Sequence, residues 1–300
     1  MVGVRTIILG YIGVGDMGGP MALNLLKAGF EVVVFDTQLN RLDRLVDAGA
    51  VSASSARDVA DKAEVVMVCL NTIAAAHAVA KDVAAGVIVK TYVDMSTTGP
   101  SVAKDVRTHF EGTEITMLDA PISGHISKAV DGTLTIIVSG PKSAAEHAKP
   151  AFEAMGENIF YIGDISGGGQ MMKLANNYLN NVQAIATSEA ITMGIKFGLD
   201  PQIMFDILNV STGRNSQTSG KLRDAVLSRK FLGGANMKIS HKDISLAVSE
   251  AESLGAPALT GALVRGIFEE ALAKGGNEER SSAIFKYVAA KADLDFDGDG

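Results

Sequence analysis

A lysine and four asparagines stand close together in the stretch GGGQMMKLANNYLNN, residues 167–181, whose other residues suit a buried helix. Four positions separate Lys173 from Asn177, so a helix would place both side chains on one face. Burial disfavours the ammonium form of a lysine, which can then exchange a proton near neutral pH. An asparagine beside it can hold a reacting oxygen. The pair predicts acid–base chemistry; a lysine that reaches solvent, with the asparagines in helix contacts, is the structural alternative.

A glycine-rich motif, GVGDMG, follows the apolar run IILGYI and precedes the helical pattern GPMALNLLKAG. Its G-x-G-x-x-G spacing allows a tight turn, close approach of the backbone to a pyrophosphate, and close packing of helix on strand. The N–H groups at the start of the helix would then bind the phosphates. A glycine turn that serves packing alone is the alternative. The motif predicts a dinucleotide site formed by Ile12, Gly13, Val14, Gly15, Asp16, Met17 and Gly18.

The next apolar run, EVVVFD, ends at Asp36, near the offset of about 20 residues at which an acid hydrogen-bonds the adenosine ribose. A carboxylate there would repel a 2′-phosphate, and Thr37 and Gln38 follow it where an arginine would receive one. The pattern favours NAD over NADP, although Arg41 could still reach a phosphate. The alternative role of Asp36 is that of a turn residue or helix cap.

Elements that would position these residues can be read along the chain. Seven short apolar runs alternate with amphipathic segments in the first half, which predicts an α/β fold with a largely parallel, doubly wound sheet. Strand signals fade after Gly163, and helical patterns follow. Asp200 before a proline predicts one helix start, and Ser240 with Asp243 predicts a capping box at another. A long helix is expected from the three glycines at 167–169 to about Phe197.

Composition excludes several classes of protein. A hydrophobic fraction of 47% over 300 residues is enough for two ordinary cores. The net charge of -7, from 27 basic and 34 acidic side chains, argues against nucleic-acid binding. Cys69 is the sole cysteine and lies in an apolar run, so we expect a buried hydrophobe in a reducing, cytoplasmic setting.

Neither a membrane segment nor a metal site is expected. The N-terminal apolar run is too short to span a bilayer and lacks the features of a signal peptide. Histidine, cysteine and carboxylate side chains show no ligand spacing. The terminal DLDFDGDG resembles the start of a calcium loop but lacks its closing glutamate, so we interpret it as a solvated acidic tail.

Four ordered motifs resemble those of the β-hydroxyacid dehydrogenases, a family that includes 3-hydroxyisobutyrate dehydrogenase and tartronate semialdehyde reductase. They are GYIGVGDMGGPMALNLLKAG, LDAPISG with DGTLTIIVSG, KLANN, and HKDISLA, and the resemblance extends to about Ala290. It implies hydride transfer between a 3-hydroxy acid and NAD. It also implies a Rossmann NAD-binding domain at residues 1–164, a helical substrate and oligomerisation domain at residues 165–300, an active site between them, and a homodimer or homotetramer.

The resemblance also implies residue roles. Lys173 matches the catalytic lysine and Asn177 its substrate-binding companion, while Ser123 and Gly124 match donors to the substrate carboxylate. Such hydrogen bonds to a carboxylate are among the stronger ones. Cofactor contacts are implied for Leu70, Thr97 and Lys242, the last of which would otherwise be interpreted as a solvated lysine at a helix start.

The chain departs from the family pattern near the substrate. His125 and Lys128 stand in SGHISKA where the family has glycines, and Ala235 stands where a phenylalanine is usual. These changes predict a bulkier or more polar substrate, for example one with a second carboxylate that His125 binds. Arg214 could reach the same site. The alternatives are that His125 points to solvent and that Arg214 is an exposed loop residue.

Two other functions remain open. An aldehyde-acid (semialdehyde) reductase would use the same residues in the reverse direction. A non-catalytic dinucleotide-binding module would be expected to lose its general base, whereas Lys173 and Asn177 are both present at the required spacing. Their presence favours an enzyme.

Overall fold

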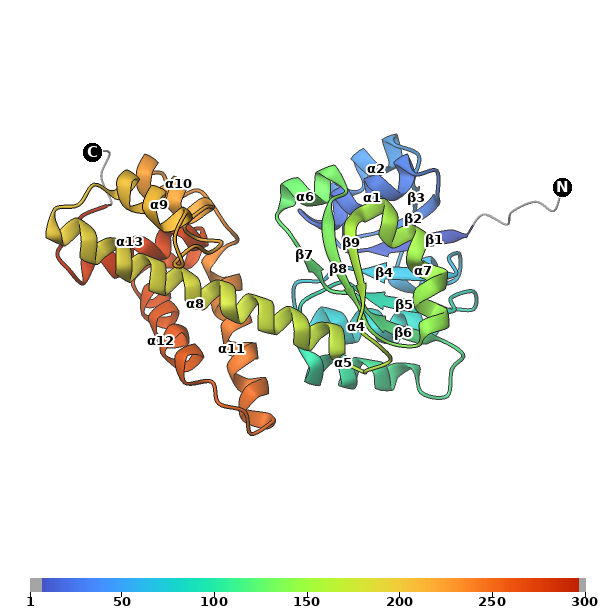
Figure 1. Cartoon of the computed structure of the whole chain (residues 1–300). Helices are drawn as coiled ribbons and strands as arrows, with labels where there is room; N and C mark the ends of the chain where they lie inside the picture. Colours follow the sequence, from blue (N-terminus) through green and yellow to red (C-terminus); the bar gives the residue numbers. More distant parts are fainter. Residues whose placement is uncertain (1–6, 297–300) are drawn as a thin grey trace. The chain divides into compact units, whose positions relative to one another are not determined.

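The computed structural model describes residues 7–296 and divides into two compact units, Met1–Lys173 and Leu174–Gly300 (Figure 1). The first is an α/β unit and the second is helical, which confirms the predicted fold class. The division falls inside one continuous helix, α8 (Gly168–Phe197). Asp297 and Gly298 of the acidic tail lie outside the described residues.

A six-stranded parallel sheet with the order β3-β2-β1-β4-β5-β6 forms the centre of the α/β unit. The order reverses between β1 and β4, and in such sheets ligands bind at the carboxyl ends of the strands near that point. The predicted glycine loop lies there. The strands are β1 (Ile8–Ile12), β2 (Glu31–Phe35), β3 (Val51–Ser52), β4 (Val65–Val68), β5 (Thr91–Asp94) and β6 (Thr116–Asp119).

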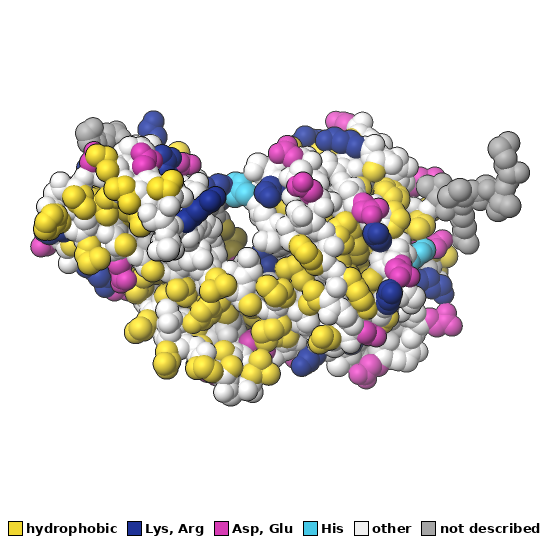
Figure 2. All heavy atoms as spheres, viewed as in Figure 1, with side chains coloured by type: hydrophobic (Ala, Val, Ile, Leu, Met, Phe, Trp, Pro, Cys, Tyr) yellow, Lys and Arg dark blue, Asp and Glu magenta, His cyan; other side chains and the backbone are white. Residues whose placement is uncertain are grey.

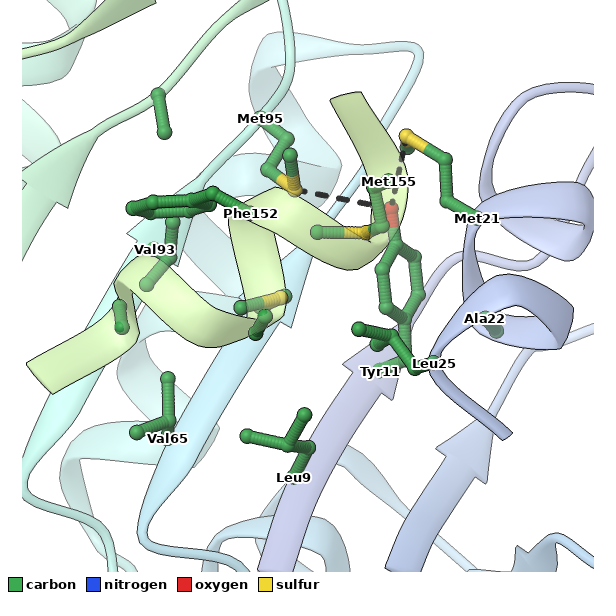
Figure 3. Close-up of a cluster of buried hydrophobic side chains, with 14 of the residues drawn as sticks. Leu9, Tyr11, Met21, Ala22, Leu25, Val65, Val93, Met95, Phe152 and Met155 are labelled. Atoms are coloured by element: carbon green, nitrogen blue, oxygen red, sulfur yellow. Dashed lines mark hydrogen bonds between the residues drawn. The ribbon is translucent and has the colours of Figure 1, made fainter. Parts of the chain in front are cut away.

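Helices cover the sheet and enclose two clusters of buried side chains. Figure 3 shows one cluster, in which the Tyr11 hydroxyl points toward the sulfur atoms of Met21 and Met95, at 3.7 and 3.8 Å. The helices of this unit are α1 (Gly18–Lys27), α2 (Asp43–Asp47), α3 (Ala56–Ala60), α4 (Ile73–Ala84), α5 (Pro100–Arg107), α6 (Ile126–Asp131) and α7 (Lys142–Met155), with 3-10 turns η1 (Leu39–Arg41) and η2 (Thr108–Phe110).

The last two apolar runs of the first half do not extend the parallel sheet. They form β8 (Leu134–Val138) and β9 (Gly156–Tyr161) of a separate three-stranded sheet with the order β7-β8-β9. Its third strand, β7 (Ile122–Ser123), is antiparallel to β8 and ends at a predicted site residue. Two-residue strands such as β7 and β3 lack the alternation by which strands are predicted.

Up to residue 296, the helical unit contains the rest of α8 and five further helices. Asp200 caps one of them as predicted, accepting from the Ile203 N–H at 3.0 Å. The expected capping box at Ser240 is wrong. That helix begins at Met237, because the Asn236 side chain accepts from the Lys238 N–H and caps it earlier. The helices are α9 (Pro201–Asn209), α10 (Lys221–Ser228), α11 (Met237–Ser253), α12 (Leu259–Ala273) and α13 (Ile284–Ala290), with η3 (Gly276–Glu278) and η4 (Ser281–Ala283).

Among residues 7–296, none of the helices combines the length and apolar character needed to cross a bilayer.

Candidate active site

The glycine loop joins β1 to α1 at the carboxyl edge of the parallel sheet. Gly13 has φ 85°, and a Cβ there would lie 2.4 Å from the Cys69 carbonyl oxygen; a Cβ at Gly18 would lie 2.0 Å from the Gly13 oxygen. Packing therefore requires both glycines. At Gly15 a Cβ would meet only the flexible Arg41 guanidinium, at 3.3 Å. The unit does not need a glycine at that position for its own packing, and the bare backbone suits a bound pyrophosphate.

Asp36 is buried directly beneath this loop. Its Oδ2 accepts from the Val14 N–H at 2.9 Å, and its Oδ1 accepts from the Gln38 N–H at 2.8 Å. Arg41 Nη1 lies 3.6 Å from Oδ2. Asp36 therefore shapes the turn, as the structural alternative held, and its carboxylate also lies beside the loop where an adenosine ribose would bind. These residues fit NAD.

Leu70 and Thr97 follow the carboxyl ends of the neighbouring strands β4 and β5. A residue that the sequence did not point out, Ser96, links them. The Leu70 N–H donates to Ser96 Oγ at 2.9 Å, and the Ser96 N–H donates to Asp94 Oδ1 at 2.9 Å. Leu70 and Thr97, which are both expected beside the nicotinamide, are thus connected through Ser96 at the carboxyl edge of the sheet.

Gln170, in the first turn of α8, holds the same edge. Its side chain is fully buried. Oε1 accepts from the N–H groups of Thr98 and Gly99, at 3.0 and 3.2 Å, and Nε2 donates to the Ser96 carbonyl oxygen at 2.9 Å. Sequence reasoning missed Gln170, although its position three residues before Lys173 on the same helix was a signal.

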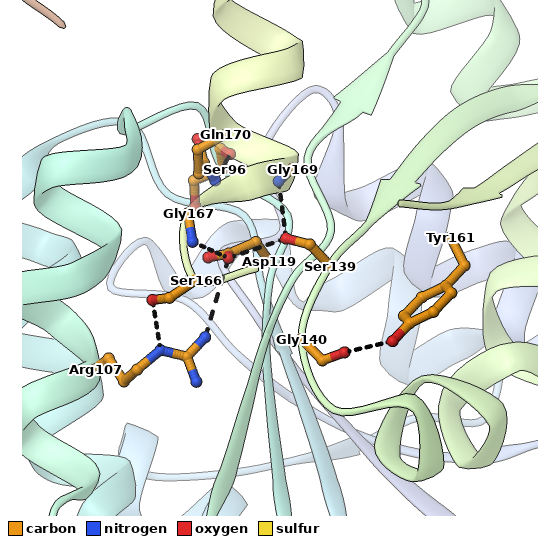
Figure 4. Close-up of polar contacts among 10 residues, drawn as sticks. All are labelled: Ser96, Arg107, Asp119, Ser139, Gly140, Tyr161, Ser166, Gly167, Gly169 and Gln170. Atoms are coloured by element: carbon orange, nitrogen blue, oxygen red, sulfur yellow. Dashed lines mark hydrogen bonds and ion pairs between the residues drawn. The ribbon is translucent and has the colours of Figure 1, made fainter. Parts of the chain in front are cut away.

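The start of α8 is fixed to the sheets by Asp119 and Ser139 (Figure 4). Asp119 Oδ2 accepts from the Gly167 N–H at 2.8 Å and from the Ser139 hydroxyl at 3.2 Å. The Gly169 N–H donates to Ser139 Oγ at 2.8 Å. Burial raises the pKa of Asp119, and its hydrogen bond from Gly167 partly offsets that effect.

Lys173 lies one turn beyond Gln170 and is only 9% exposed. Asn177 follows one turn later in the same helix. Its Nδ2 donates to Asp243 Oδ2 at 2.7 Å, and its Oδ1 accepts from Asn176 Nδ2 at 3.1 Å. A lysine is rarely this buried without a specific environment.

Two other asparagines of α8 have structural partners within the helical unit. Asn180 Oδ1 accepts from Gln217 Nε2 at 2.8 Å, and Asn181 Nδ2 donates to the Ser240 carbonyl oxygen at 3.4 Å. Helix contacts therefore account for these two side chains, as the structural alternative proposed.

The remaining substrate-side predictions fall in both units. Ser123 ends β7, and Gly124, with φ 148°, leads to His125, which precedes α6 and is exposed. Lys128 is exposed within α6.

In the helical unit, Lys242 is 40% exposed and its Nζ lies 3.1 Å from Asp243 Oδ1. Arg214 is exposed and lines an open pocket with Asn209, Ser219 and Arg223. Ala235 is also exposed.

Comparison with known proteins identifies the family. Residues 8–163 match the NAD binding domain of 6-phosphogluconate dehydrogenase, and residues 167–288 match the family described as NAD-binding of NADP-dependent 3-hydroxyisobutyrate dehydrogenase. A 3-hydroxyisobutyrate dehydrogenase of Pseudomonas aeruginosa is 37% identical over 87% of this chain and 90% of its own. The chain belongs to the β-hydroxyacid dehydrogenase family.

Two further relatives support this membership. An NAD-dependent L-serine dehydrogenase of Pseudomonas aeruginosa is 36% identical over 93% of this chain and 96% of its own. The structure of a Mycobacterium tuberculosis 3-hydroxyisobutyrate dehydrogenase with L-serine superposes with a TM-score of 0.86 at 28% identity, covering 94% of this chain and 98% of that one. This β-hydroxyacid dehydrogenase is thus an NAD-binding oxidoreductase, as the glycine loop and Asp36 predicted.

Proposed function

We propose that this protein oxidises the hydroxyl group of a short 3-hydroxy acid with NAD. The observation that carries the proposal is a buried lysine, Lys173, one helical turn from a glutamine that holds the loop bearing Thr97. Bound NAD supplies the hydride acceptor. Because the family relatives are named for 3-hydroxyisobutyrate and L-serine, both 3-hydroxy acids, a carboxylate two carbons from the reacting carbon is the expected common feature.

The side chains would manage the proton and the substrate's orientation. Lys173 Nζ would take the hydroxyl proton as the carbon–hydrogen bond breaks. Asp243 accepts from Nδ2 of the Asn177 carboxamide, and Asn177 Oδ1, which accepts from Asn176 Nδ2, has a second lone pair suited to a substrate hydroxyl. The Ser123 hydroxyl and the N–H groups of the following loop would donate to the substrate carboxylate.

We further propose that the substrate carries a polar substituent or a second carboxylate. His125 and Lys128 bring two potential cations to the loop after Ser123, and both side chains are exposed. A site that forms hydrogen bonds with a substituent strongly discriminates against analogues that lack this substituent, because the polar groups of the site are then left unpaired.

The test is the appearance of reduced nicotinamide absorbance, with NAD and NADP in separate reactions, over 3-hydroxyisobutyrate, L-serine and a dicarboxylic 3-hydroxy acid. We expect NAD reduction with at least one, and a preference for a polar substrate that falls in the His125→Gly, Lys128→Gly double variant. Unchanged preference in that variant would remove the loop from substrate selection. If the protein binds NAD but shows no turnover in both the oxidation and the reduction assays, the result would point instead to a non-catalytic module.

The same site would serve the reverse reaction, reduction of an aldehyde acid, since one set of residues catalyses both directions. Assays of NADH oxidation with the corresponding semialdehydes give the ratio of the two rates.

We also propose a homodimer or homotetramer assembled through the helical unit. Figure 2 shows hydrophobic side chains over the exposed surface of its helices. On α12, Leu259 and Leu263 are 81% and 72% exposed, and Leu254 at the end of α11 is 66% exposed. A patch of this kind on a folded unit is typical of an interface.

A further inference from the structure

Gln170 brackets Thr97 from both sides. Its carboxamide donates to the carbonyl of the preceding residue, Ser96, and accepts from the N–H of the following residue, Thr98, and from that of Gly99. Every one of these partners is a backbone group. The Gln170 side chain therefore fixes the course of the loop through its backbone.

The helix that carries Gln170 has a rigid base. The N–H groups of Gly167 and Gly169 are held by Asp119 Oδ2 and Ser139 Oγ, each at 2.8 Å. Figure 4 shows these contacts and the Gln170 side chain around the first turn of α8. A shift of this turn would break buried hydrogen bonds, and this cost opposes movement of Gln170 with the loop.

Hydrogen bonds and the first turns of α8 together connect three residues with expected roles in the reaction. Gln170 binds Ser96, Ser96 Oγ accepts from the Leu70 N–H, and Lys173 follows Gln170 by one turn of α8. Leu70 and Thr97 are expected beside the nicotinamide, and Lys173 is expected to accept the proton. Leu70, Thr97 and Lys173 are far apart in the sequence, so contacts between neighbouring residues cannot fix their positions relative to one another.

We propose that Gln170 is a positioning residue for hydride transfer, because its carboxamide fixes the Thr97 loop to the helix that carries Lys173. This inference rests on the proposed dehydrogenase function. Hydride transfer requires reacting atoms in a narrow range of distance and orientation, and a displacement of about 1 Å can cost roughly 100-fold in rate. The dinucleotide's phosphates and ribose bind elsewhere, at the glycine loop and Asp36.

The first test is Gln170→Met, which keeps the length of the side chain and removes all three hydrogen bonds. We expect kcat to fall by about 10- to 100-fold, while the Kd for NAD changes by less than about 3-fold. The primary deuterium isotope effect on kcat, measured with substrate deuterated at the reacting carbon, should rise as hydride transfer becomes slower than product release.

The matched control is Tyr161→Phe. The Tyr161 hydroxyl donates to the Gly140 carbonyl oxygen at 3.0 Å in the same unit, and its loss does not touch the Thr97 loop. We expect this variant to keep the wild-type kcat and isotope effect.

A second variant, Gln170→Glu, keeps the proposal testable if Gln170→Met does not fold. Its neutral carboxyl can accept from Thr98 and donate to Ser96, whereas its ionised form cannot donate. The kcat of folded Gln170→Glu should therefore decline with rising pH through a titration absent from the wild type, and circular dichroism confirms that the protein stays folded over that range.

A Gln170→Met enzyme that loses stability but keeps kcat within about 2-fold and an unchanged isotope effect would overturn the proposal. So would a Gln170→Glu profile parallel to the wild type. Failure of the wild type itself to turn over would contradict the proposed function instead, and is seen before either variant is measured.

Discussion

Asp94 and Asp119 occupy paired register positions at the ends of β5 and β6, and both side chains are fully buried. The pKa of Asp94 is raised from 3.8 to about 6, mainly by burial, with a further contribution from the neighbouring Asp119, while the Ser96 hydrogen bonds act to lower it. In the unfolded chain the carboxyl would titrate near its ordinary value. Between these two values the folded protein binds more protons than the unfolded chain, so Asp94 makes stability fall as pH rises.

Asp94→Asn should remove this contribution while keeping an acceptor for the Ser96 N–H. As pH rises from 4 to 7, the free energy of unfolding of the variant should increase relative to that of the wild type by up to about 3 kcal/mol. Most of this change should occur below about pH 6. Urea unfolding at a series of pH values measures the difference. A constant difference across that range would show that Asp94 is already ionised in the fold at pH 4.

Asp36 controls the choice of cofactor in this account, and Asp36→Asn removes its negative charge together with one of its two backbone hydrogen bonds. The amide can still accept from the Val14 N–H, but the negative charge facing a 2′-phosphate is gone and Arg41 loses its ion pair. We expect the ratio of kcat/KM for NAD to that for NADP to fall by about 10-fold or more. Steady-state kinetics with both cofactors measure it, and an unchanged ratio would assign Asp36 to the turn alone.

Sequence reasoning found the residues whose role follows from a local pattern. Gly13 and Gly18 are required by close backbone contacts, and the spacing that reveals them lies within six residues. Ser96 and Gln170 act through hydrogen bonds between segments more than 70 residues apart. A local sequence pattern does not contain such a partner, so the fold was needed to identify these contacts, although the place of Gln170 on the helix of Lys173 could be seen in the sequence.

At the scale of elements, the approach of α8 to α5 depends on a glycine. Gly167 has φ +76°, and a Cβ there would lie 2.8 Å from Pro100 Cβ and 3.0 Å from its Cα. Pro100 begins α5, immediately after the loop that Gln170 holds. The loop before α8 therefore packs against the first residue of α5 without space for a side chain.

Gly167→Ala should destabilise the fold by about 2–4 kcal/mol, since strain at positive φ adds to the overlap with Pro100. Gly112 offers a matched control, because it has the same φ of +76° and open space around it. Gly112→Ala should cost only about 1 kcal/mol. Thermal or urea unfolding measures the stability of both variants. Equal losses of stability would show that the close contact with Pro100 adds nothing to the cost of substituting Gly167.

Elements with a strong apolar pattern could be predicted, and those defined by distant pairing could not. All seven apolar runs contain strands, but the last two pair with each other in a second sheet, which also contains the two-residue strand β7, and a local pattern does not show which strands pair. The predicted cap at Ser240 failed because its pattern is satisfied inside a helix as well; Ser240 is buried there, and Asn236 caps the helix four residues earlier.

At the scale of the whole molecule, the proposed assembly makes the helical unit's exposed leucines an interface. Leu263→Arg should shift the mass measured by light scattering toward that of the 31.2 kDa monomer, because burying an unpaired charge opposes association. Val87→Arg, at a position 73% exposed in the α/β unit, is the control and should leave the mass unchanged. An unchanged mass for Leu263→Arg would place the interface elsewhere.

The central claim is that Lys173 carries the proton in NAD-dependent oxidation of a 3-hydroxy acid. Its most direct test compares the rate of NADH formation by wild type, Lys173→Ala and Lys196→Ala, an exposed lysine of the same helix, with NAD binding measured in parallel. We predict that Lys173→Ala binds NAD normally and loses about 100- to 10,000-fold in kcat, while Lys196→Ala matches the wild type. Wild-type turnover by Lys173→Ala would contradict the account.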